Sequence, residues 1–436
     1  MPTLALPALP DLLALHEADP QRFPVLLETG SGDGWDILLA LPQQVHRADA
    51  GEGATFLARF ETEWRERPDA VADAAHVPFR GGWFVYLGYE MLHVLEPSVV
   101  ARDEQPAFPL AVRMRIPAAI QIDRRRGQAW LFAESRHSLH ELRAAIAATP
   151  AASGSAAALL ESLQEEDEQI FLDNVATVQD YIRAGDVFQV NLSRRWHARL
   201  TSQASAAQLY RTLRAGNPVP FGGIASLGER QSIVSASPER LLRVKAGRAL
   251  TRPIAGTWPR DPDPLRDALQ REQLLAHPKE RAEHVMLVDL ERNDLGRVCL
   301  PGSVRVEELM GVASYAWVHH IESTVSGRLQ PGVTPVALLR ALFPGGTITG
   351  CPKVRTMQII RELEPQARNA YTGSMGYVNI DGDLDLNILI RSAMIDDRRA
   401  EFSAGAGIVA DSQPQRELAE TRAKVRGMLR AFGAAS

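Results

Sequence analysis

Two glutamates near the C-terminus have a spacing that suits metal binding. Glu417 and Glu420 lie in QPQRELAETRAK, which directly follows the small-residue segment AGAGIVADS. Helical residues three or four apart share a face, so these carboxylates and Lys424 would point the same way. The glycines before them let a ligand approach the backbone closely. We therefore predict here a site for a small anion that is held through a metal.

The glycine-rich segment PGGTITGCPK is a second candidate for anion binding. It lacks the Gly-Lys-Ser/Thr ending of a nucleotide-binding loop, because Cys351 and Pro352 come before Lys353. Its backbone N–H groups would still precede the N-terminus of a helix, where anions bind well. The alternative is an ordinary tight turn. For AGAGIVADS, the alternative is a strand that contains a bulge.

Carboxylates also recur in KERAEHVMLVDLERNDLG, a predicted helix that carries Glu280, Glu283 and Asp294. Such residues more often form a solvated helix face. Glu283, however, precedes the apolar run VMLV, which predicts a place at the buried edge of the helix. One glutamate from this helix and one from the C-terminal helix would suit Mg²⁺, since that ion takes one or two carboxylates, several waters and an anionic substrate.

A histidine and an arginine complete the candidate set. His320, which follows His319, could act as a general acid near neutral pH if it lay in a cleft. A structural role is the commoner alternative for such a histidine. Arg391 is predicted to lie inside the apolar strand LNILIRSAMI. A buried arginine requires an anionic partner, which could be a ligand carboxylate or a structural aspartate.

Composition narrows the class of protein. The chain has 436 residues, a formal net charge of −5 and two cysteines. This length suits one large domain or two to three ordinary ones. The charge, without long basic runs, argues against nucleic acid as a partner. Two cysteines cannot form a disulfide framework, and we find no signal peptide or membrane-spanning run, so we expect a cytoplasmic protein.

We predict two regions, residues 1–150 and 165–432, joined by a linker near 149–165. The linker is indicated by a segment rich in Ala, Ser and Gly and by the acidic stretch that follows it. In the first region, strands are predicted in WDILLALP and GGWFVYLGYE, two further strands joined by an Arg-Gly turn in AVRMRIPAAIQIDRRRGQAWLFAE, and a helix over 139–148.

The second region has a more regular pattern. Helices are predicted over 170–184, 280–295 and 354–363, and a strand is predicted in VFQVNLSRRWHARL. YTGSMGYVNI, DGD and LDLNILIRSAMID predict a strand, a turn and a second strand. Strand pairs that alternate with helices favour an α+β fold with largely antiparallel sheets covered by helices.

From about residue 170 to residue 432, the chain closely resembles the chorismate-utilising enzymes, which include anthranilate, aminodeoxychorismate, isochorismate and salicylate synthases. The resemblance implies two large, mostly antiparallel sheets packed as a sandwich with helices outside. Residues 1–150 resemble, more weakly, the N-terminal region of anthranilate synthase component I. The motifs are GDVFQVNLS, SASPERLL, PIAGT, ERAEHVMLVDLERNDLGRV, FPGGTITGCPKVRTMQIIRELEP, YTGSMGY, ILIRS and AGAGIVADS.

The resemblance also implies roles for individual residues. His320 would protonate the departing ring hydroxyl, and Tyr371 and Arg391 would hold the enolpyruvyl carboxylate of chorismate. The implied ligands of Mg²⁺ are Glu283, Glu417 and Glu420. The implied catalytic residues are His320, Glu239 in SPER and Thr257 in PIAGT. The implied substrate contacts are Thr347, Tyr371, Arg391, Gly405, Gly407 and Lys424.

Several positions resemble the ammonia-using branch. Isochorismate-forming enzymes carry a water-activating lysine where this chain has Gln189. Asn191, the Gly345–Gly346 pair and RNAYTGS resemble aminodeoxychorismate synthase component I. That branch converts chorismate and ammonia to 4-amino-4-deoxychorismate, for p-aminobenzoate and folate.

One motif departs from that branch. Many aminodeoxychorismate synthases read PIKGT, with a lysine proposed to attack ring carbon C2, but this chain has Ala255 there, as in anthranilate synthase. Component I of anthranilate synthase, in tryptophan biosynthesis, is therefore the alternative. Its LLES segment helps to bind inhibitory tryptophan. This chain reads LLETG, with Thr29 at the serine, which argues against that inhibition. Glu322 in HHIEST is not accounted for by the resemblance.

The source of ammonia must also be considered. A glutaminase uses a nucleophilic cysteine, and neither Cys299 nor Cys351 lies in a strand–elbow–helix context. We therefore expect a separate glutaminase subunit, or activity with free ammonium. A catalytically silent subunit that only binds a ligand is an alternative from another class. The intact set of acids argues against it.

Overall fold

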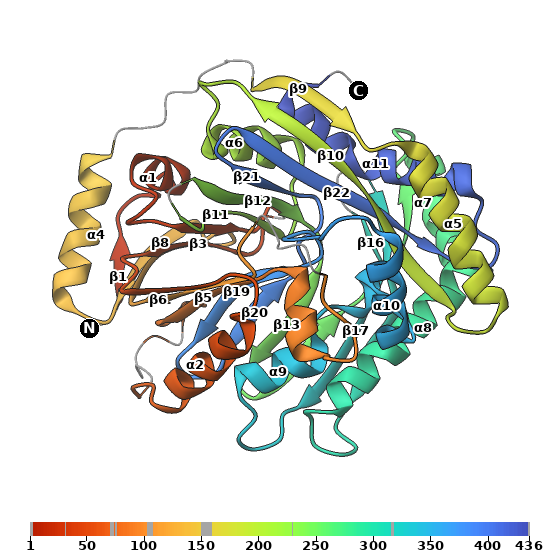
Figure 1. The fold of residues 1–436 in the computed structure, drawn as a ribbon. Helices are drawn as coiled ribbons and strands as arrows, with labels where there is room; N and C mark the ends of the chain where they lie inside the picture. The colour runs from red at the N-terminus through yellow and green to blue at the C-terminus, as the bar shows by residue number, and fades with distance from the viewer. Residues whose placement is uncertain are drawn as a thin grey trace.

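Two β-sheets lie face to face at the centre of the molecule, and helices cover their outer sides (Figure 1). The computed structural model describes residues 3–30, 32–69, 74, 76–102, 108–149, 159–228, 230–314 and 318–434. Within these residues, neighbouring strands run antiparallel. The predicted α+β fold, a sandwich of two large antiparallel sheets, is confirmed.

The two sheets have twelve and ten strands in the described residues. The first contains, in spatial order, β1 (Thr3–Leu6), β8 (Gln128–Ala133), β7 (Ala118–Asp123), β3 (Trp35–Ala40), β2 (Val25–Glu28), β11 (Phe221–Ser226), β12 (Gln231–Ser237), β21 (Ser392–Asp396), β22 (Arg399–Ile408), β10 (Gln189–Leu200) and β18 (Gly350–Cys351), and β9 (Leu160–Glu165) also pairs with β10. The second contains β15 (Ile254–Pro259), β17 (Val318–Arg328), β14 (Arg248–Arg252), β13 (Arg240–Lys245), β20 (Leu384–Asn387), β19 (Ser374–Asn379), β5 (Gly82–Leu87), β6 (Ala111–Ile116) and β4 (Gln44–Ala48), and β16 (Arg305–Ser314) also pairs with β17.

Helices surround this sandwich. They are α1 (Leu12–Ala18), α2 (Gly53–Arg65), α3 (Leu92–Leu95), α4 (Arg136–Ala148), α5 (Glu168–Arg183), α6 (Ala206–Gly216), α7 (Pro264–Ala276), α8 (Pro278–Gly296), α9 (Pro335–Leu342), α10 (Lys353–Leu363) and α11 (Pro414–Phe432), with the short 3-10 helices η2 (Tyr89–Met91) and η3 (Gly346–Ile348). The helices predicted over 170–184, 280–295 and 354–363 are confirmed as α5, α8 and α10. As predicted, α5 stops at Gly185, which has a φ of +83°. No helix in the described residues is long and apolar enough to cross a membrane.

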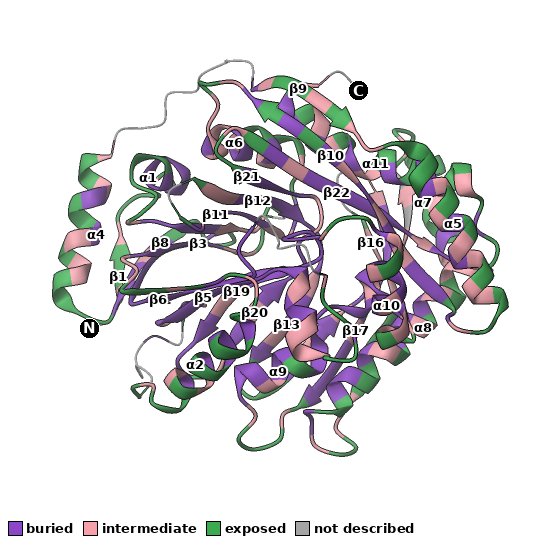
Figure 2. Cartoon of the chain, viewed as in Figure 1, coloured by how far each residue is buried: buried purple, intermediate pink, exposed green. Residues whose placement is uncertain are grey.

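Central strands are buried on both faces. In β3, Ile37 and Leu39 face the core between the sheets, and Leu38 faces the core under α1, α4, α6 and α11. In β5, Phe84 lies between the sheets, and Val85 packs toward the helices on the other side. Figure 2 shows these buried strands at the centre and the exposed outer faces of the helices. Side chains therefore still point alternately to the two faces of each strand, but the residues on both faces are apolar.

This double burial explains one wrong prediction. The segment 111–134 contains three strands rather than the two that its pattern predicts. Pro117 separates β6, in the second sheet, from β7, in the first. The predicted Arg-Gly turn does join two strands, β7 and β8, with Gly127 at a φ of +62°. Residues on both sides of Pro117 are apolar and buried, so the hydrophobic pattern does not mark the change of sheet.

Strands from the first 150 residues extend both sheets. β2 pairs with β11, and β5 pairs with β19. Within the segment 149–165, where a linker is predicted, residues 160–165 form β9 and pair with β10. Leu160 and Leu163 pack against the core there, while the acidic residues beside them conceal the strand in the sequence. Residues 150–158 of the predicted linker lie outside the described residues.

Close packing between β19 and β20 predicts a large cost for one methyl group. An added Cβ at Gly376 would lie 2.0 Å from the backbone oxygen of Asp385. We expect Gly376→Ala to lower the free energy of unfolding by about 3 kcal/mol, because backbone must move. Gly296→Ala, where a Cβ meets no heavy atom within 4 Å, serves as the control and should be neutral or slightly stabilising. Equal midpoints for the two variants in urea denaturation would contradict this account.

Candidate active site

Two predicted site residues lie where the chain passes from one sheet to the other. Glu239 connects β12 to β13, and Arg391 connects β20 to β21. Arg391 has a φ of +51°, a left-handed conformation that a strand does not hold. The prediction that Arg391 lies inside one continuous strand is therefore wrong. The apolar run LNILIRSAMI hides this crossover because its two halves are buried in different sheets.

The two crossovers are hydrogen-bonded to each other. The backbone N–H of Ala236 donates to the carbonyl of Arg391 at 3.0 Å, and that of Ile388 donates to the carbonyl of Glu239 at 3.0 Å. Backbone hydrogen bonds of this kind fix the relative position of the segments that make them. Glu239 and Arg391 are consequently held on one frame, although they lie far apart in the sequence.

A cavity of about 120 Å³ lies beside these crossovers. Its polar and charged walls include seven of the residues selected from the sequence. These are Glu239, His320, Thr347, Tyr371, Arg391, Gly405 and Lys424. Asn191, Ile254, Ile348 and Ser403 also line it. The chain therefore brings together, in one cavity, side chains from both sheets, from η3 and from α11.

Gly405 shows why a small residue is needed in this wall. An added Cβ would lie 2.5 Å from Oδ1 of Asn191 and 2.9 Å from the hydroxyl oxygen of Tyr371. Gly407 does not line the cavity. An added Cβ at Gly407 would lie 2.2 Å from Nε2 of Gln189. Thr257 lies on β15, opposite His320 in the ladder with β17, and its side chain is outside the described structure.

Three buried oxygen atoms of the cavity have no hydrogen-bond partner among the described residues. They are Oδ1 of Asn191, Oε1 of Glu239 and Oγ1 of Thr347. Buried polar atoms in folded proteins are nearly always hydrogen-bonded, and an unsatisfied one costs stability. Polar groups are thus directed into the cavity without an internal partner. This arrangement suits a polar ligand rather than an apolar one.

The positive groups of the cavity lie on opposite elements. Lys424, on α11, donates from Nζ to the carbonyl of Gly405 at 2.9 Å and pairs with Glu420 Oε1 at 2.7 Å. Arg391 comes from the crossover. Burial, with a contribution from the positive charges of Arg391 and Lys424, lowers the pKa of His320 to about 3. His320 is therefore neutral in this structure at physiological pH.

The proton of the His320 ring can be assigned from its neighbour. Nδ1 lies 3.2 Å from the carbonyl oxygen of Gly256, which can only accept a hydrogen bond. Nδ1 must therefore carry the proton, and Nε2 is the basic nitrogen. Glu239 behaves in the opposite way: burial raises its pKa to about 8, and the charges of Glu291 and Glu322 contribute. Near neutral pH, Glu239 is accordingly protonated, and Nε2 of His320 is not.

The predicted metal ligands lie outside this cavity, on α8 and α11. Glu417 is buried and Glu420 is exposed. Burial raises the pKa of Glu283 to about 7, and the charges of Glu280, Glu417 and Glu420 contribute to the rise. The carboxylates of the two helices are therefore electrostatic neighbours. As placed, no three His, Cys, Asp or Glu side chains in the described residues form a group that could hold a metal ion.

A larger cavity, of about 610 Å³, lies between the sheets and shares Pro238 and Ile254 with the smaller one. Thr29 of LLETG lines it. Glu322, which the resemblance leaves unexplained, is buried in its wall and forms an ion pair with Arg252, with Oε2 of Glu322 2.8 Å from Nε of Arg252. This ion pair accounts for an acidic residue at that position, because a buried carboxylate requires a cationic partner.

Sequence reasoning did not select several residues that shape the site. In the sequence, Asn191 was used only to recognise the ammonia-using branch. In the structure, it lies on β10, where it pairs with Gly407 and lines the cavity. Glu291 is buried on α8, and burial raises its pKa to about 7. Glu291 gave no signal in the sequence, because the predicted helix carries several acidic residues and only the structure shows that Glu291 and Asp294 are buried while Asp289 is exposed. Ile348 lies in η3, whose glycines predict a turn but not its orientation.

The raised pKa of Glu239 makes stability depend on pH. The folded pKa is about 8 and the ordinary value is 4.5, so the folded state binds the extra proton between these pH values. The free energy of unfolding contributed by this group therefore falls as the pH rises through that window. From pH 6 to pH 8.5, wild type should lose up to about 2 kcal/mol more than Glu239→Gln in urea denaturation.

Glu161→Gln is the matched control, because the Glu161 side chain is 50% exposed and already paired with Arg199 and Arg398. It should follow the wild-type pH dependence. Parallel curves for wild type and Glu239→Gln would show that Glu239 is ionised in the folded protein at neutral pH, against this account.

Comparison with known proteins agrees with this geometry. A sequence model of the family described as chorismate binding enzyme matches residues 23–430. Anthranilate synthase component 1 of Streptomyces coelicolor is 41% identical over 375 residues, which cover 81% of this chain and 73% of that protein. Aminodeoxychorismate synthase component 1 of Klebsiella aerogenes is 40% identical over 356 residues, covering 81% and 78%.

A solved structure is similar over nearly the whole chain. The crystal structure of anthranilate synthase component I from Streptococcus pneumoniae superposes with a TM-score of 0.79 and 31% identity, covering 91% of this chain and 92% of that one. The family match includes the strands from β2 onward and the cavity residues. This chain belongs to the family of chorismate binding enzymes.

Proposed function

We propose that the chain aminates chorismate, with 4-amino-4-deoxychorismate as product and ammonia as the nitrogen donor. The observation that carries this proposal is one buried cavity that combines two cations, Arg391 and Lys424, with the acid–base pair Glu239 and His320. Chorismate carries one carboxylate on its ring and one on its enolpyruvyl side chain. Arginine is well suited to grip one of them through two hydrogen bonds, and the hydroxyl of Tyr371 lies in the same wall.

The protonation states suggest how the ring hydroxyl departs. Hydroxide is a poor leaving group, so a proton must reach the oxygen as the carbon–oxygen bond breaks. In the ligand-free cavity, Glu239 is protonated and His320 is a neutral imidazole without a proton on Nε2. A dianion bound beside His320 would raise its pKa, because negative charge favours the imidazolium. We propose that His320 then delivers the proton, that the hydroxyl leaves as water, and that ammonia forms the new bond to the ring and loses one proton.

Mg²⁺ fits the carboxylates between α8 and α11. Oε1 of Glu283 is buried and accepts no hydrogen bond within the described residues, although Nζ of Lys279 lies 3.7 Å away. Burial raises the pKa of Glu283 to about 7, and the charges of Glu280, Glu417 and Glu420 add to the rise. Mg²⁺ requires only one or two protein carboxylates, so a complete cage of side chains is not needed. Glu283, Glu417 and Glu420 would hold the ion. When bound, it would neutralise the ring carboxylate and draw electrons toward it.

Ammonia must reach the cavity from outside this chain. Burial raises the pKa of Cys299 to about 11 and also raises that of Cys351. Neither thiol is activated for attack on glutamine, since thiolates are the nucleophiles in such reactions. This supports a separate glutaminase subunit, or the direct use of ammonium.

Amination is favoured over hydration by Gln189. This residue stands where isochorismate-forming enzymes carry a water-activating lysine, and an amide cannot act as that base. Formation of anthranilate is the second candidate. Ala255 in PIAGT favours it, because an alanine cannot attack ring carbon C2 as the lysine of PIKGT is proposed to do. Asn191 and the Gly345–Gly346 pair favour the first candidate.

Product analysis separates these candidates. Protein, chorismate, Mg²⁺ and ammonium are incubated and analysed by mass and fluorescence, with ammonium omitted as the control. We expect 4-amino-4-deoxychorismate that depends on ammonium. Fluorescent anthranilate would establish the second candidate instead. If chorismate is not consumed under any amine or metal condition, the chain is a ligand-binding subunit rather than an enzyme.

Removal of the proposed metal ligands should separate catalysis from folding. Glu283→Ala and Glu420→Ala are expected to abolish Mg²⁺-dependent turnover and to leave the thermal unfolding midpoint near that of wild type. Asp289→Ala, on an exposed position of α8, should retain activity and serves as the control. Turnover near the wild-type rate in either glutamate variant would refute the metal assignment.

A further inference from the structure

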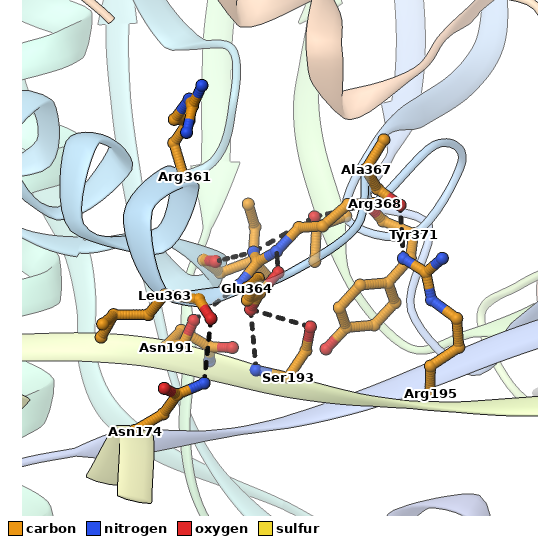
Figure 3. Close-up of polar contacts among 12 residues, drawn as sticks. Asn174, Asn191, Ser193, Arg195, Arg361, Leu363, Glu364, Ala367, Arg368 and Tyr371 are labelled. Atoms are coloured by element: carbon orange, nitrogen blue, oxygen red, sulfur yellow. Dashed lines mark hydrogen bonds and ion pairs between the residues drawn. The ribbon is translucent and has the colours of Figure 1, made fainter. Parts of the chain in front are cut away.

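A buried ion pair lies directly behind the wall of the smaller cavity (Figure 3). Arg368 and Glu364 are 2% and 5% exposed. The guanidinium donates from Nε to Glu364 Oε2 at 2.8 Å and from Nη2 to Glu364 Oε1 at 2.6 Å. This is the planar, two-bond geometry that arginine forms with carboxylates and lysine cannot reproduce. Neither residue lines the cavity.

The remaining donors of Arg368 reach segments that do line the cavity. Nη2 donates to the carbonyl of Asn191 at 2.7 Å, and Nη1 donates to the carbonyl of Ile348 at 3.0 Å. The guanidinium carbon also lies 5.6 Å from the ring centroid of Tyr371. Asn191, Ile348 and Tyr371 come from β10, η3 and the loop before β19. One side chain therefore contacts three separate parts of the cavity wall.

Glu364 also binds β10 directly, through Ser193. Its Oε1 accepts hydrogen bonds from both the backbone N–H and the hydroxyl of Ser193, each at 2.9 Å. Ser193 is two residues beyond Asn191 on β10. The carboxylate thus ties β10 to the end of α10, and Figure 3 shows Glu364 between Ser193 and Arg368.

The loop that carries Tyr371 needs external support. Asn369 and Thr372 have φ values of +54° and +63°, which are costly for residues other than glycine. The half-buried side chain of Glu90 accepts hydrogen bonds from the backbone N–H groups of Arg368, at 2.7 Å, and Asn369, at 2.9 Å. Nη1 of Arg368 lies 3.4 Å from Oγ1 of Thr372. Strained backbone persists only where its surroundings determine it, and Arg368 supplies part of that support.

We infer that Arg368, held by Glu364, is a positioning residue that sets Asn191 and Tyr371 for the bound substrate. This inference rests on the proposed function, because it assumes that the smaller cavity binds chorismate. Arg368 itself contacts no reacting atom. Its contribution comes from the fixed relative placement of cavity groups, and misplacement by about 1 Å in an active site can cost roughly 100-fold in rate.

A double-mutant cycle tests this inference. Arg368→Lys should keep the charge and the fold but lower kcat/KM by roughly 100-fold at a temperature where the variant is fully folded. Tyr371→Phe should reduce kcat/KM strongly in the wild-type background, and by less than about twofold in the Arg368→Lys background, because the hydroxyl is no longer placed. Additive effects of the two changes would overturn the inference.

Arg113→Lys is the matched control. Arg113 is fully buried, pairs with Glu63, and lies over the rings of Phe56 and Phe60. It lies on β6, toward the opposite end of the second sheet from β15 and β17, which carry cavity residues. The variant Arg113→Lys should lose comparable stability without a change in kcat/KM. The same result for Arg368→Lys would show that Arg368 has a merely structural role.

A second measurement does not depend on turnover. In the crystal structure of Arg368→Lys, the side chains of Asn191 and Tyr371 should be displaced from their wild-type positions. If they are unmoved, the inference is wrong whichever product the enzyme makes. If they are displaced but wild type does not consume chorismate, the proposed function fails while the positioning role of Arg368 in this cavity stands.

Discussion

A pocket for a small dianion must keep charged side chains at fixed positions away from bulk water, and the fold meets this constraint at the junction of its two sheets. Glu239 and Arg391 occupy strand crossovers rather than strands, so their side chains are not committed to either face of a sheet. Hydrogen bonds between the crossovers fix them relative to each other. The surrounding strands supply the rigidity that a loop alone would lack.

Burial at this junction also sets the charge of the empty cavity. The same desolvation that moves the pKa of Glu239 up to about 8 moves that of His320 down to about 3. Both groups are therefore neutral near pH 7, so neither adds negative charge beside Arg391 and Lys424, although Lys424 also pairs with Glu420. A dianionic ligand would meet two cationic side chains without repulsion from Glu239. The carboxylates of α8 and α11, where a divalent cation would be bound, do not line this cavity.

The sequence predicts much of this arrangement because its motifs combine residue types that chemistry requires with local signals for helices and turns. α5 and α8 end where glycine predicts, and the motif residues His320, Tyr371 and Gly405 meet in one cavity. The failures have a common cause. Pro117 and Arg391 lie at sheet crossovers inside apolar runs, where hydrophobic periodicity continues across the change of sheet. Arg368 and Glu364 are four residues apart at the end of a helix, and only the tertiary structure shows that they support the cavity wall.

The central claim is that chorismate binds in the smaller cavity, between the crossovers and α11. A crystal structure of the protein with chorismate and Mg²⁺, without ammonium, tests it most directly. This account predicts the ligand beside Glu239 and His320, with one carboxylate at Arg391 and Tyr371. Chorismate in the larger cavity beside Arg252 and Glu322, with the smaller one empty, would contradict it.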